Sequence, residues 1–137
     1  MRVMSGLRRF RTLHVLHNGW GAVHLGATGI MAWWSFILLM PGDTFGIAAT
    51  FDTMAGIADE PVWAVLFGVI ALIGLWGVET RSPQVRRASA LVLSFGHSLI
   101  AWCVWDGAPL TTGTGTYTFV ALLAMGRLVS IDSHESV

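Results

Sequence analysis

Charged residues are scarce in this chain, because only 12% of its 137 residues are Asp, Glu, Lys or Arg. The eight basic and eight acidic residues cancel, so the chain lacks the net basic charge that nucleic-acid binding requires. Its one cysteine, Cys103, cannot form an intramolecular disulfide and says nothing about the redox compartment. In contrast, 54% of the residues are apolar and the mean hydropathy is +0.65, far from the average soluble domain. The composition predicts an integral membrane protein whose main partner is the lipid bilayer, with no nucleic-acid partner.

The signatures of enzymes and of metal sites are also missing. The sequence has no Cys and His cluster with metal spacing, no phosphate-cradling glycine loop, and no Ser, His and acid set that can be assembled. Gly113, Thr114 and Gly115 are typical of a turn, not of a nucleotide loop. Acidic residues between positions 43 and 60 are expected to be solvated, because nothing holds their oxygens around an ion. We therefore predict that the protein is not an enzyme and binds no metal or cofactor.

The positions of the arginines predict the membrane topology. They lie before the first apolar run, between the second and third runs, and in the fourth: Arg2, Arg8, Arg9, Arg11, Arg81, Arg86, Arg87 and Arg127. The connections after the first and third runs carry acids and no basic residue. Because basic residues concentrate in cytoplasmic segments, this alternation predicts four crossings with both the N-terminus and the C-terminus in the cytoplasm.

Four apolar segments predict transmembrane helices at about residues 20–40, 62–78, 88–105 and 116–131. The predicted fold is a single all-α membrane domain, residues 1–137, in which four helices form an up-and-down bundle. A cleaved signal peptide is the alternative for the first segment, but a signal h-region is only about 7 to 15 residues long, so we prefer an uncleaved helix. Arg127 falls within the fourth segment and can reach the cytoplasmic surface by extending its side chain along the helix.

The connections between these helices differ in composition. Residues 44–58 place apolar side chains at three- and four-residue spacing opposite Asp52, which predicts a short amphipathic helix in the outer interface. An irregular loop packed on the mouth of the bundle is the alternative. Asp59 can cap the second helix, and Pro61 suits its first turn. Residues 106–116 are rich in Gly, Pro and Thr and predict a loop.

Small residues mark the faces on which the helices pack. Gly26, Gly68 and Ser94 each lie among other small residues at helical spacing, which lets transmembrane helices approach closely. The pattern does not distinguish packing within one chain from packing between chains. A homo-oligomer therefore stays open beside intramolecular packing.

Three residues are candidate functional groups within the membrane: His24, His97 and Arg127. Paired histidines could hold a haem, but at 1.5 Å per residue His24 lies about 24 Å and His97 about 12 Å below the outer ends of their helices. Two ligands of one haem iron need nearly equal depth, so this pair is disfavoured. The structural alternative is a neutral imidazole satisfied by a hydroxyl on the same helix face, such as Thr28 or Ser94.

A further pattern lies around the first and last connections of the chain. It comprises Met40–Phe45, Phe51, Met54, Ile57, Glu60–Trp63, Pro109–Gly113 and Tyr117. With these residues the chain resembles, over roughly Trp34 to Ser130, a family of small membrane proteins encoded by tailed bacteriophages and prophages. Members of that family are mostly of uncharacterised function. The resemblance implies a phage origin and a four-helix layout, and it implies no activity.

Two classes of function follow from these observations. The first is a multi-pass protein of the bacterial host's inner membrane that permeabilises the bilayer like a holin, or serves infection in another accessory role. A pore of this kind needs self-association. The alternative is a haem- or quinone-associated membrane anchor subunit of a redox complex, which needs a bound cofactor.

Overall fold

The computed structural model describes residues 19–80, 82–107 and 111–133, with side chains between residues 21 and 126. In chain order the elements are α2 (Gly19–Leu39), the 3-10 turns η1 (Phe45–Ile47) and η2 (Ala49–Phe51), α3 (Asp52–Ile57), α4 (Glu60–Glu79), α5 (Pro83–Gly107) and α6 (Thr112–Ser133). No strand occurs within these ranges. The prediction of an all-helical fold class is therefore confirmed for the described residues. The four arginines before residue 19 lie outside the described residues.

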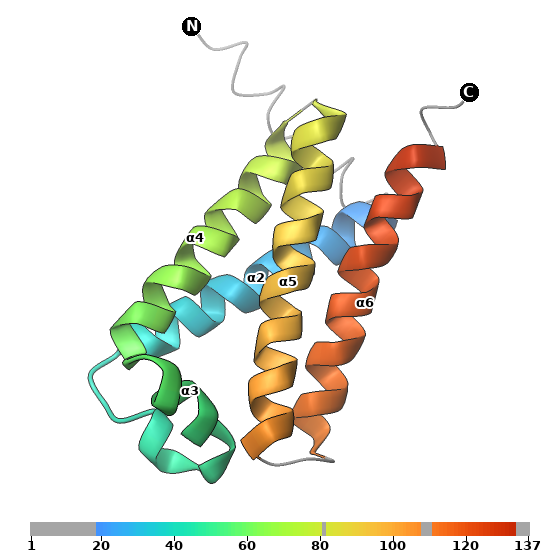
Figure 1. Cartoon of the computed structure of the whole chain (residues 1–137). Helices are drawn as coiled ribbons and strands as arrows, with labels where there is room; N and C mark the ends of the chain where they lie inside the picture. Colours follow the sequence, from blue (N-terminus) through green and yellow to red (C-terminus); the bar gives the residue numbers. More distant parts are fainter. Residues whose placement is uncertain (1–18, 81, 108–110, 134–137) are drawn as a thin grey trace, which may run out of the picture.

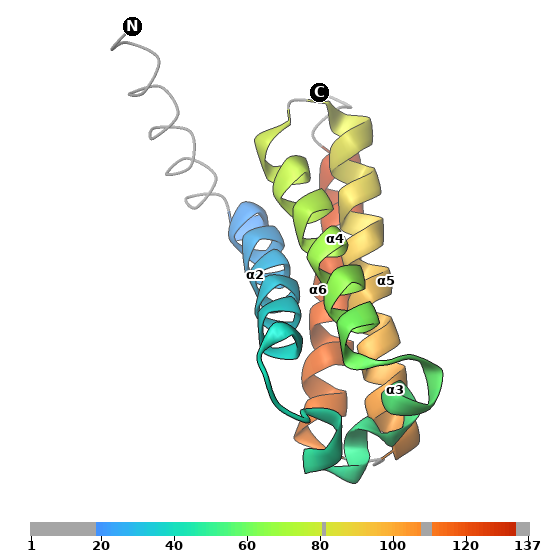
Figure 2. The ribbon, with the colours of Figure 1, turned by 90° about the vertical axis from the view of Figure 1, so that its left-hand side faces the viewer.

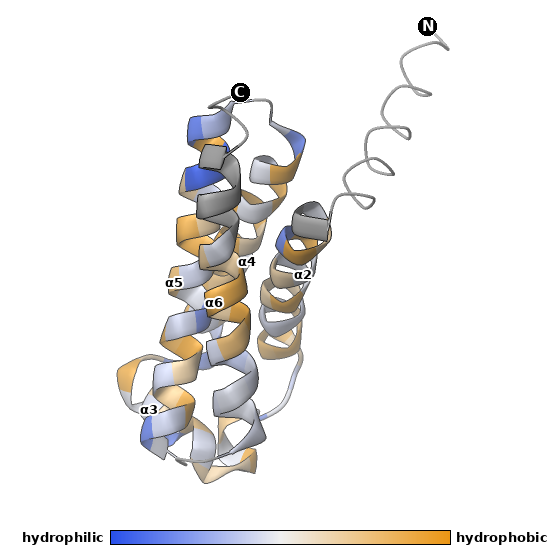
Figure 3. Ribbon diagram, turned by 90° about the vertical axis from the view of Figure 1, so that its right-hand side faces the viewer, coloured by the Kyte–Doolittle hydropathy of each residue, from blue (hydrophilic) through white to orange (hydrophobic). Residues whose placement is uncertain are grey.

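Three of the described helices are long and apolar enough to cross a membrane: α2 over Gly21–Leu39, α4 and α5. Their outward faces are apolar, because Trp33, Leu72 and Phe95 are 61%, 66% and 63% exposed. Figure 3 shows the most hydrophilic residues near the start of α5 and around α3, at opposite ends of the long helices. These features match a protein whose sides contact lipid and whose ends contact water.

The long helices pack in the order α2, α4, α5 and α6, and α2 also contacts α6. Consecutive long helices run in opposite directions (Figures 1 and 2). Their shared interior is filled by apolar side chains that are fully buried: Met31 from α2, Phe67 from α4, and Leu93 and Ile100 from α5. The fold therefore brings histidines from α2 and α5 into a densely packed interior.

Helix α4 begins much as its sequence predicts, with one difference. Asp59 occupies the N-cap position, but its side chain makes no capping hydrogen bond. Instead its carbonyl oxygen accepts hydrogen bonds from the amides of Val62 and Trp63, at 3.0 and 3.3 Å. Pro61 lies in the first turn, where its missing amide hydrogen costs nothing.

The predicted loop at residues 106–116 is wrong over most of its length. Helix α5 continues through Gly107, and α6 already begins at Thr112, so Gly113, Thr114 and Gly115 are helical. The cause is a threonine cap: the amide of Thr114 donates to Thr111 Oγ1 at 3.3 Å, which satisfies a backbone donor at the helix start. This local bond offsets the weak helix propensity of the Gly and Thr residues.

Residues 45–57 form a compact segment that we call the α3 cap, because it covers one end of the long helices (Figure 1). It consists of η1, η2 and α3 rather than one continuous helix. Phe45 and Met54 insert into the core and are 7% and 0% exposed. Hydrogen bonds attach the α3 cap to the long helices. Trp63 Nε1 donates to the carbonyl of Met54 at 2.9 Å, Thr53 Oγ1 donates to Asp106 Oδ2 at 2.8 Å, and the amide of Phe45 donates to Glu60 Oε1 at 2.6 Å.

An aromatic cluster closes the same end from inside. Trp34 of α2 packs against Phe51, Phe67 and Tyr117, with ring centroids 5.7 to 6.3 Å apart. Its indole Nε1 also donates to the hydroxyl of Tyr117 at 2.6 Å, which links α2 to α6. Aromatic contacts and a satisfied indole N–H together stabilise this end of the molecule.

Candidate functional site

The first candidate histidine, His24, joins three helices. Its Nε2 lies 3.1 Å from the carbonyl oxygen of Gly74 in α4 and 3.5 Å from the hydroxyl of Ser89 in α5. Because a carbonyl oxygen only accepts hydrogen bonds, this geometry assigns the ring proton to Nε2. His24 is 5% exposed and Ser89 is fully buried, so these contacts are shielded from solvent.

Glycines of α4 make room for this contact. A Cβ atom added to Gly77 would overlap the hydroxyl of Ser89 and come within 3.2 Å of His24 Nε2. A Cβ added to Gly74 would overlap the hydroxyl of Thr28, which donates to the carbonyl of His24 at 2.8 Å. The close approach of α2, α4 and α5 therefore requires glycine at both positions.

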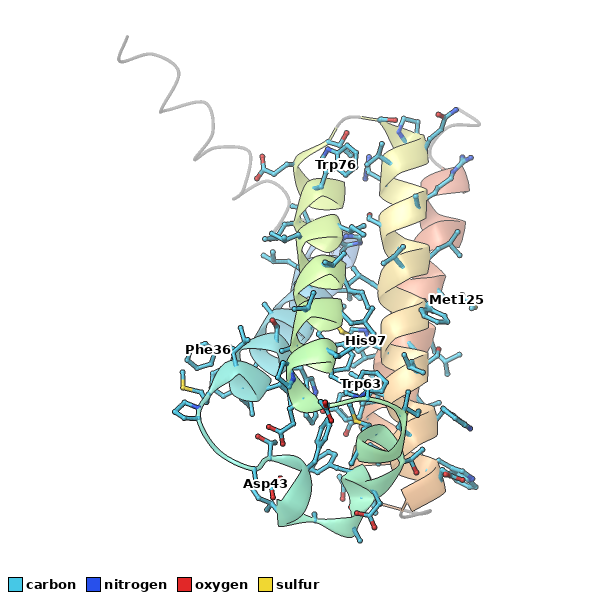
Figure 4. All side chains as sticks on the ribbon, turned by 60° about the vertical axis from the view of Figure 1, so that its left-hand side comes forward. Phe36, Asp43, Trp63, Trp76, His97 and Met125 are labelled. Atoms are coloured by element: carbon cyan, nitrogen blue, oxygen red, sulfur yellow. The ribbon has the colours of Figure 1, made fainter. Side chains whose placement is uncertain are left out.

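The second candidate, His97, lies in the interior, whereas Phe36, Trp76 and Met125 lie on the outside (Figure 4). Its Nδ1 is 2.8 Å from the carbonyl oxygen of Leu93, one turn earlier in α5. The other ring nitrogen, Nε2, is buried and has no hydrogen-bond partner among the described residues. The expected partner Ser94 does not serve this ring, because its hydroxyl donates to the carbonyl of Ala121 at 3.1 Å.

The two histidines do not form one site. Ser89, which neighbours His24, precedes His97 by eight residues of α5, a separation of about 12 Å along the helix axis. Within the described residues, no group of three or more His, Cys, Asp or Glu side chains is placed to hold a metal ion. Each histidine therefore forms a separate site.

The small residues predicted at helix faces lie in different surroundings. Gly68 lies against Ser35 of α2, whose hydroxyl donates to the carbonyl of Ala64 at 2.8 Å. Ser94 joins α5 to α6 through the carbonyl of Ala121. Gly26, in contrast, is exposed, and a Cβ atom built there meets nothing within 4 Å. Among these residues, Gly26 is the one whose side is left open by the part of the chain that the structure describes.

Three arginines lie in the last two long helices, Arg86 and Arg87 in α5 and Arg127 in α6. Arg127 belongs to α6, but its side chain lies outside the described part of the molecule. Arg86 and Arg87 lie in the first turns of α5, at the end opposite to the α3 cap. These two positions belong to the arginine pattern from which the topology is predicted.

A surface cavity of about 400 Å³ lies beside the α3 cap and is lined by Gly42, Asp43, Phe45, Ala55, Ala58, Asp59 and Glu60. Two of its carboxylates already accept backbone hydrogen bonds. Asp43 accepts from the amide of Gly46 at 2.8 Å, and Glu60 accepts from the amide of Phe45 at 2.6 Å. These carboxylates hold the connection in place, which is a structural role.

Sequence reasoning missed the partners of His24. The histidine and Thr28 were recognised by helical spacing, but Gly74, Gly77 and Ser89 lie 50 to 65 residues away in the chain. The signal that could have found the glycines is the small-residue face of α4, which continues beyond Gly68 to both of them.

Comparisons with protein-family models, with curated proteins and with solved structures find no significant match.

Proposed function

We propose that this chain is a phage- or prophage-type protein that crosses the inner membrane of a bacterial host four times and permeabilises it by self-association, as a holin does. The observation that carries this proposal is the open face of α2 around Gly26, together with a closed interior.

The fourth crossing is supported by the length and neighbours of α6. Its 22 residues extend about 33 Å, enough for the hydrocarbon core of a bilayer. It packs against α5, which is itself long and apolar enough to span, and runs in the opposite direction. Its outward side chains Phe119, Leu122 and Met125 are apolar and more than half exposed. A helix with these properties is stable in lipid and poorly stable in water.

The orientation is supported by the charges at the two ends. Arg86 and Arg87 lie at one end, and the α3 cap with Asp52 and Thr53 lies at the other. Under the positive-inside rule, the arginine end is cytoplasmic and the α3 cap faces the periplasm. Both termini are then cytoplasmic, because four helices separate them.

The association is supported by the contrast between the interior and the α2 surface. The shared interior of the four long helices is filled by side chains such as Met31 and Phe67, so it leaves no polar lumen within the described residues. A pore therefore has to form between copies of the chain. Gly26 and Gly29 are both exposed and open on α2, and small residues on a lipid-facing helix allow a second helix to approach closely.

Gly26→Leu tests this association. In a mild detergent, the wild type should form oligomers detected by cross-linking and light scattering, and the variant should dissociate because the added side chain separates the backbones. Induced expression of the wild type should collapse the membrane potential abruptly, and the variant should delay or abolish the collapse. The matched control is Gly115→Leu, another exposed and open glycine, on α6. A wild type that inserts, stays monomeric and leaves the potential intact would refute the proposal.

Cysteine labelling tests the four crossings separately. In a Cys103→Ala background, a membrane-impermeant maleimide added to intact spheroplasts should modify cysteines introduced at Asp52 and Thr112. Cysteines at Ser82 and Ser133 should be modified only after the membrane is opened. Labelling at Ser133 from outside would mean that α6 does not cross, and labelling at Ser82 would overturn the whole topology.

One observation favours the alternative role as a redox anchor subunit, namely the unpartnered Nε2 of His97. A single buried imidazole nitrogen can ligate a haem iron. His24, whose ring contacts Gly74 and Ser89, does not supply a second ligand at that depth. The anchor role predicts a Soret band in the purified protein that is lost in His97→Ala, and the holin-like role predicts no such band.

A further inference from the structure

The ring of His97 has a defined tautomer. Nδ1 lies 2.8 Å from the carbonyl oxygen of Leu93, and a carbonyl oxygen only accepts hydrogen bonds. The ring proton is therefore on Nδ1, and Nε2 carries a lone pair. This nitrogen has no hydrogen-bond partner among the described residues, and the side chain is 0% exposed. The neutral ring thus presents one unused proton-accepting site to the interior.

No polar atom of the described residues makes a hydrogen bond to Nε2. Leu93 and Ile100, four residues before and three residues after His97 on α5, are fully buried, as is Met31 of α2, and the hydroxyl of Ser94 donates to Ala121 instead. The elements packed against α5 are α2, α3, α4, α6 and η2. The described titratable or charged side chains on these elements and on α5 itself are His24, Asp52, Glu60, Glu79, Arg86, Arg87, Cys103, Asp106 and Tyr117. None of them makes a hydrogen bond to Nε2.

We propose that His97 is a proton-sensitive switch that holds the helices packed when its ring is neutral and loosens them when Nε2 takes up a proton. Protonation converts the lone pair into an N–H donor and adds a positive charge. Among the described residues, none is placed to accept a hydrogen bond from that donor or to pair with that charge, and an unpaired buried charge is strongly unfavourable. An arrangement that lets water reach the ring removes this penalty.

The direction of the pH dependence follows from proton linkage. A hydrated imidazole takes up a proton near pH 6.5. Below that pH, the loosened or unfolded state binds one more proton at this site than the packed state does, so the packed state loses stability as the pH falls. For each pH unit below about 6.5, the ratio of packed to loosened molecules should fall by up to about tenfold. Above that pH, the contribution of this site should be constant.

The test uses the purified full chain in a mild detergent, unfolded by SDS titration and followed by tryptophan fluorescence at pH 7.5 and pH 5.5. We expect the packed-to-unfolded ratio of the wild type to fall about tenfold more between these pH values than that of His97→Leu. His97→Gln, which keeps a polar group that does not titrate, is a second variant in case the leucine packs poorly. His24→Gln is the control. It changes the other buried histidine and leaves His97 in place, so it should retain the pH response of the wild type.

Two outcomes would overturn the switch. One is an equal pH dependence of the wild type and both His97 variants, since all the other histidines are common to them. The other is a protonated His97 ring, identified by its ¹⁵N chemical shifts, in protein that remains fully packed at pH 5.5. Both measurements are independent of permeabilisation, so the switch and the proposed function can fail separately.

Discussion

The two buried histidines are the same residue type on neighbouring helices, yet they are held differently. His24 is positioned by tertiary contacts, because its Nε2 meets Gly74 in another helix and lies near Ser89 in a third. His97 is positioned by its own helix, through the carbonyl of Leu93. His24 thus stabilises the packing of helices, whereas His97 occupies the interior and leaves one ring nitrogen unused.

Depth in an apolar core therefore does not decide whether a polar group has a hydrogen-bond partner. What decides is whether a backbone carbonyl of a neighbouring helix comes close enough to accept. At His24 the glycines of α4 allow that approach, because a side chain at Gly77 would overlap Ser89. No comparable backbone contact is made to Nε2 of His97 among the described residues. Substitutions at the glycine, at each histidine and at two interhelical serines test this contrast.

Gly77→Leu should break the His24 contacts altogether. The new side chain would overlap Ser89 and push α4 away from α5, so the free energy of unfolding should fall by about 3 kcal/mol or more. SDS titration followed by tryptophan fluorescence measures this loss. Gly115→Leu provides the matched control and should change little, because a Cβ there meets nothing within 4 Å. Equal losses at both positions would mean that α4 does not approach α5 closely.

Replacing each histidine with leucine should change the free energy of unfolding to different extents. At pH 7.5, His24→Leu should lower the free energy of unfolding by about 1 kcal/mol, because its interhelical hydrogen bond is lost. His97→Leu should leave it within about 0.5 kcal/mol or raise it, because the substitution removes an unsatisfied buried acceptor. Paired unfolding measurements check the order. A larger loss for His97→Leu would indicate that its Nε2 has a partner.

Ser35→Ala should lower the free energy of unfolding by about 0.6 kcal/mol, less than His24→Leu does. Its hydroxyl donates to the carbonyl of Ala64 at 2.8 Å, so it represents an ordinary hydrogen bond between helices without a histidine. Ser94→Ala removes a bond of the same type, at 3.1 Å, and should cost no more. A loss at Ser35 as large as that at His24 would show that the imidazole adds nothing beyond one hydrogen bond.

Much of the architecture could be predicted because its causes are local. The apolar composition and the long apolar segments indicate helices in lipid, and α2, α4 and α5 have the length and apolarity of spans. The errors are also local in origin. Gly and Thr at residues 112–116 predicted a loop, but one side-chain cap from Thr111 starts the helix there. The fourth span, the orientation and the function stay predictions for the experiments above.

The helical fold and the apolar surface follow from the sequence alone, because hydrophobicity and helical period are properties of neighbouring residues along the chain. Which small residues face a neighbouring helix depends on how the helices pack. Gly26 and Gly77 look alike in the sequence, yet one is open and the other lies against Ser89. The partner of His24 in another helix likewise follows from tertiary packing, because the two residues are 50 positions apart in the chain.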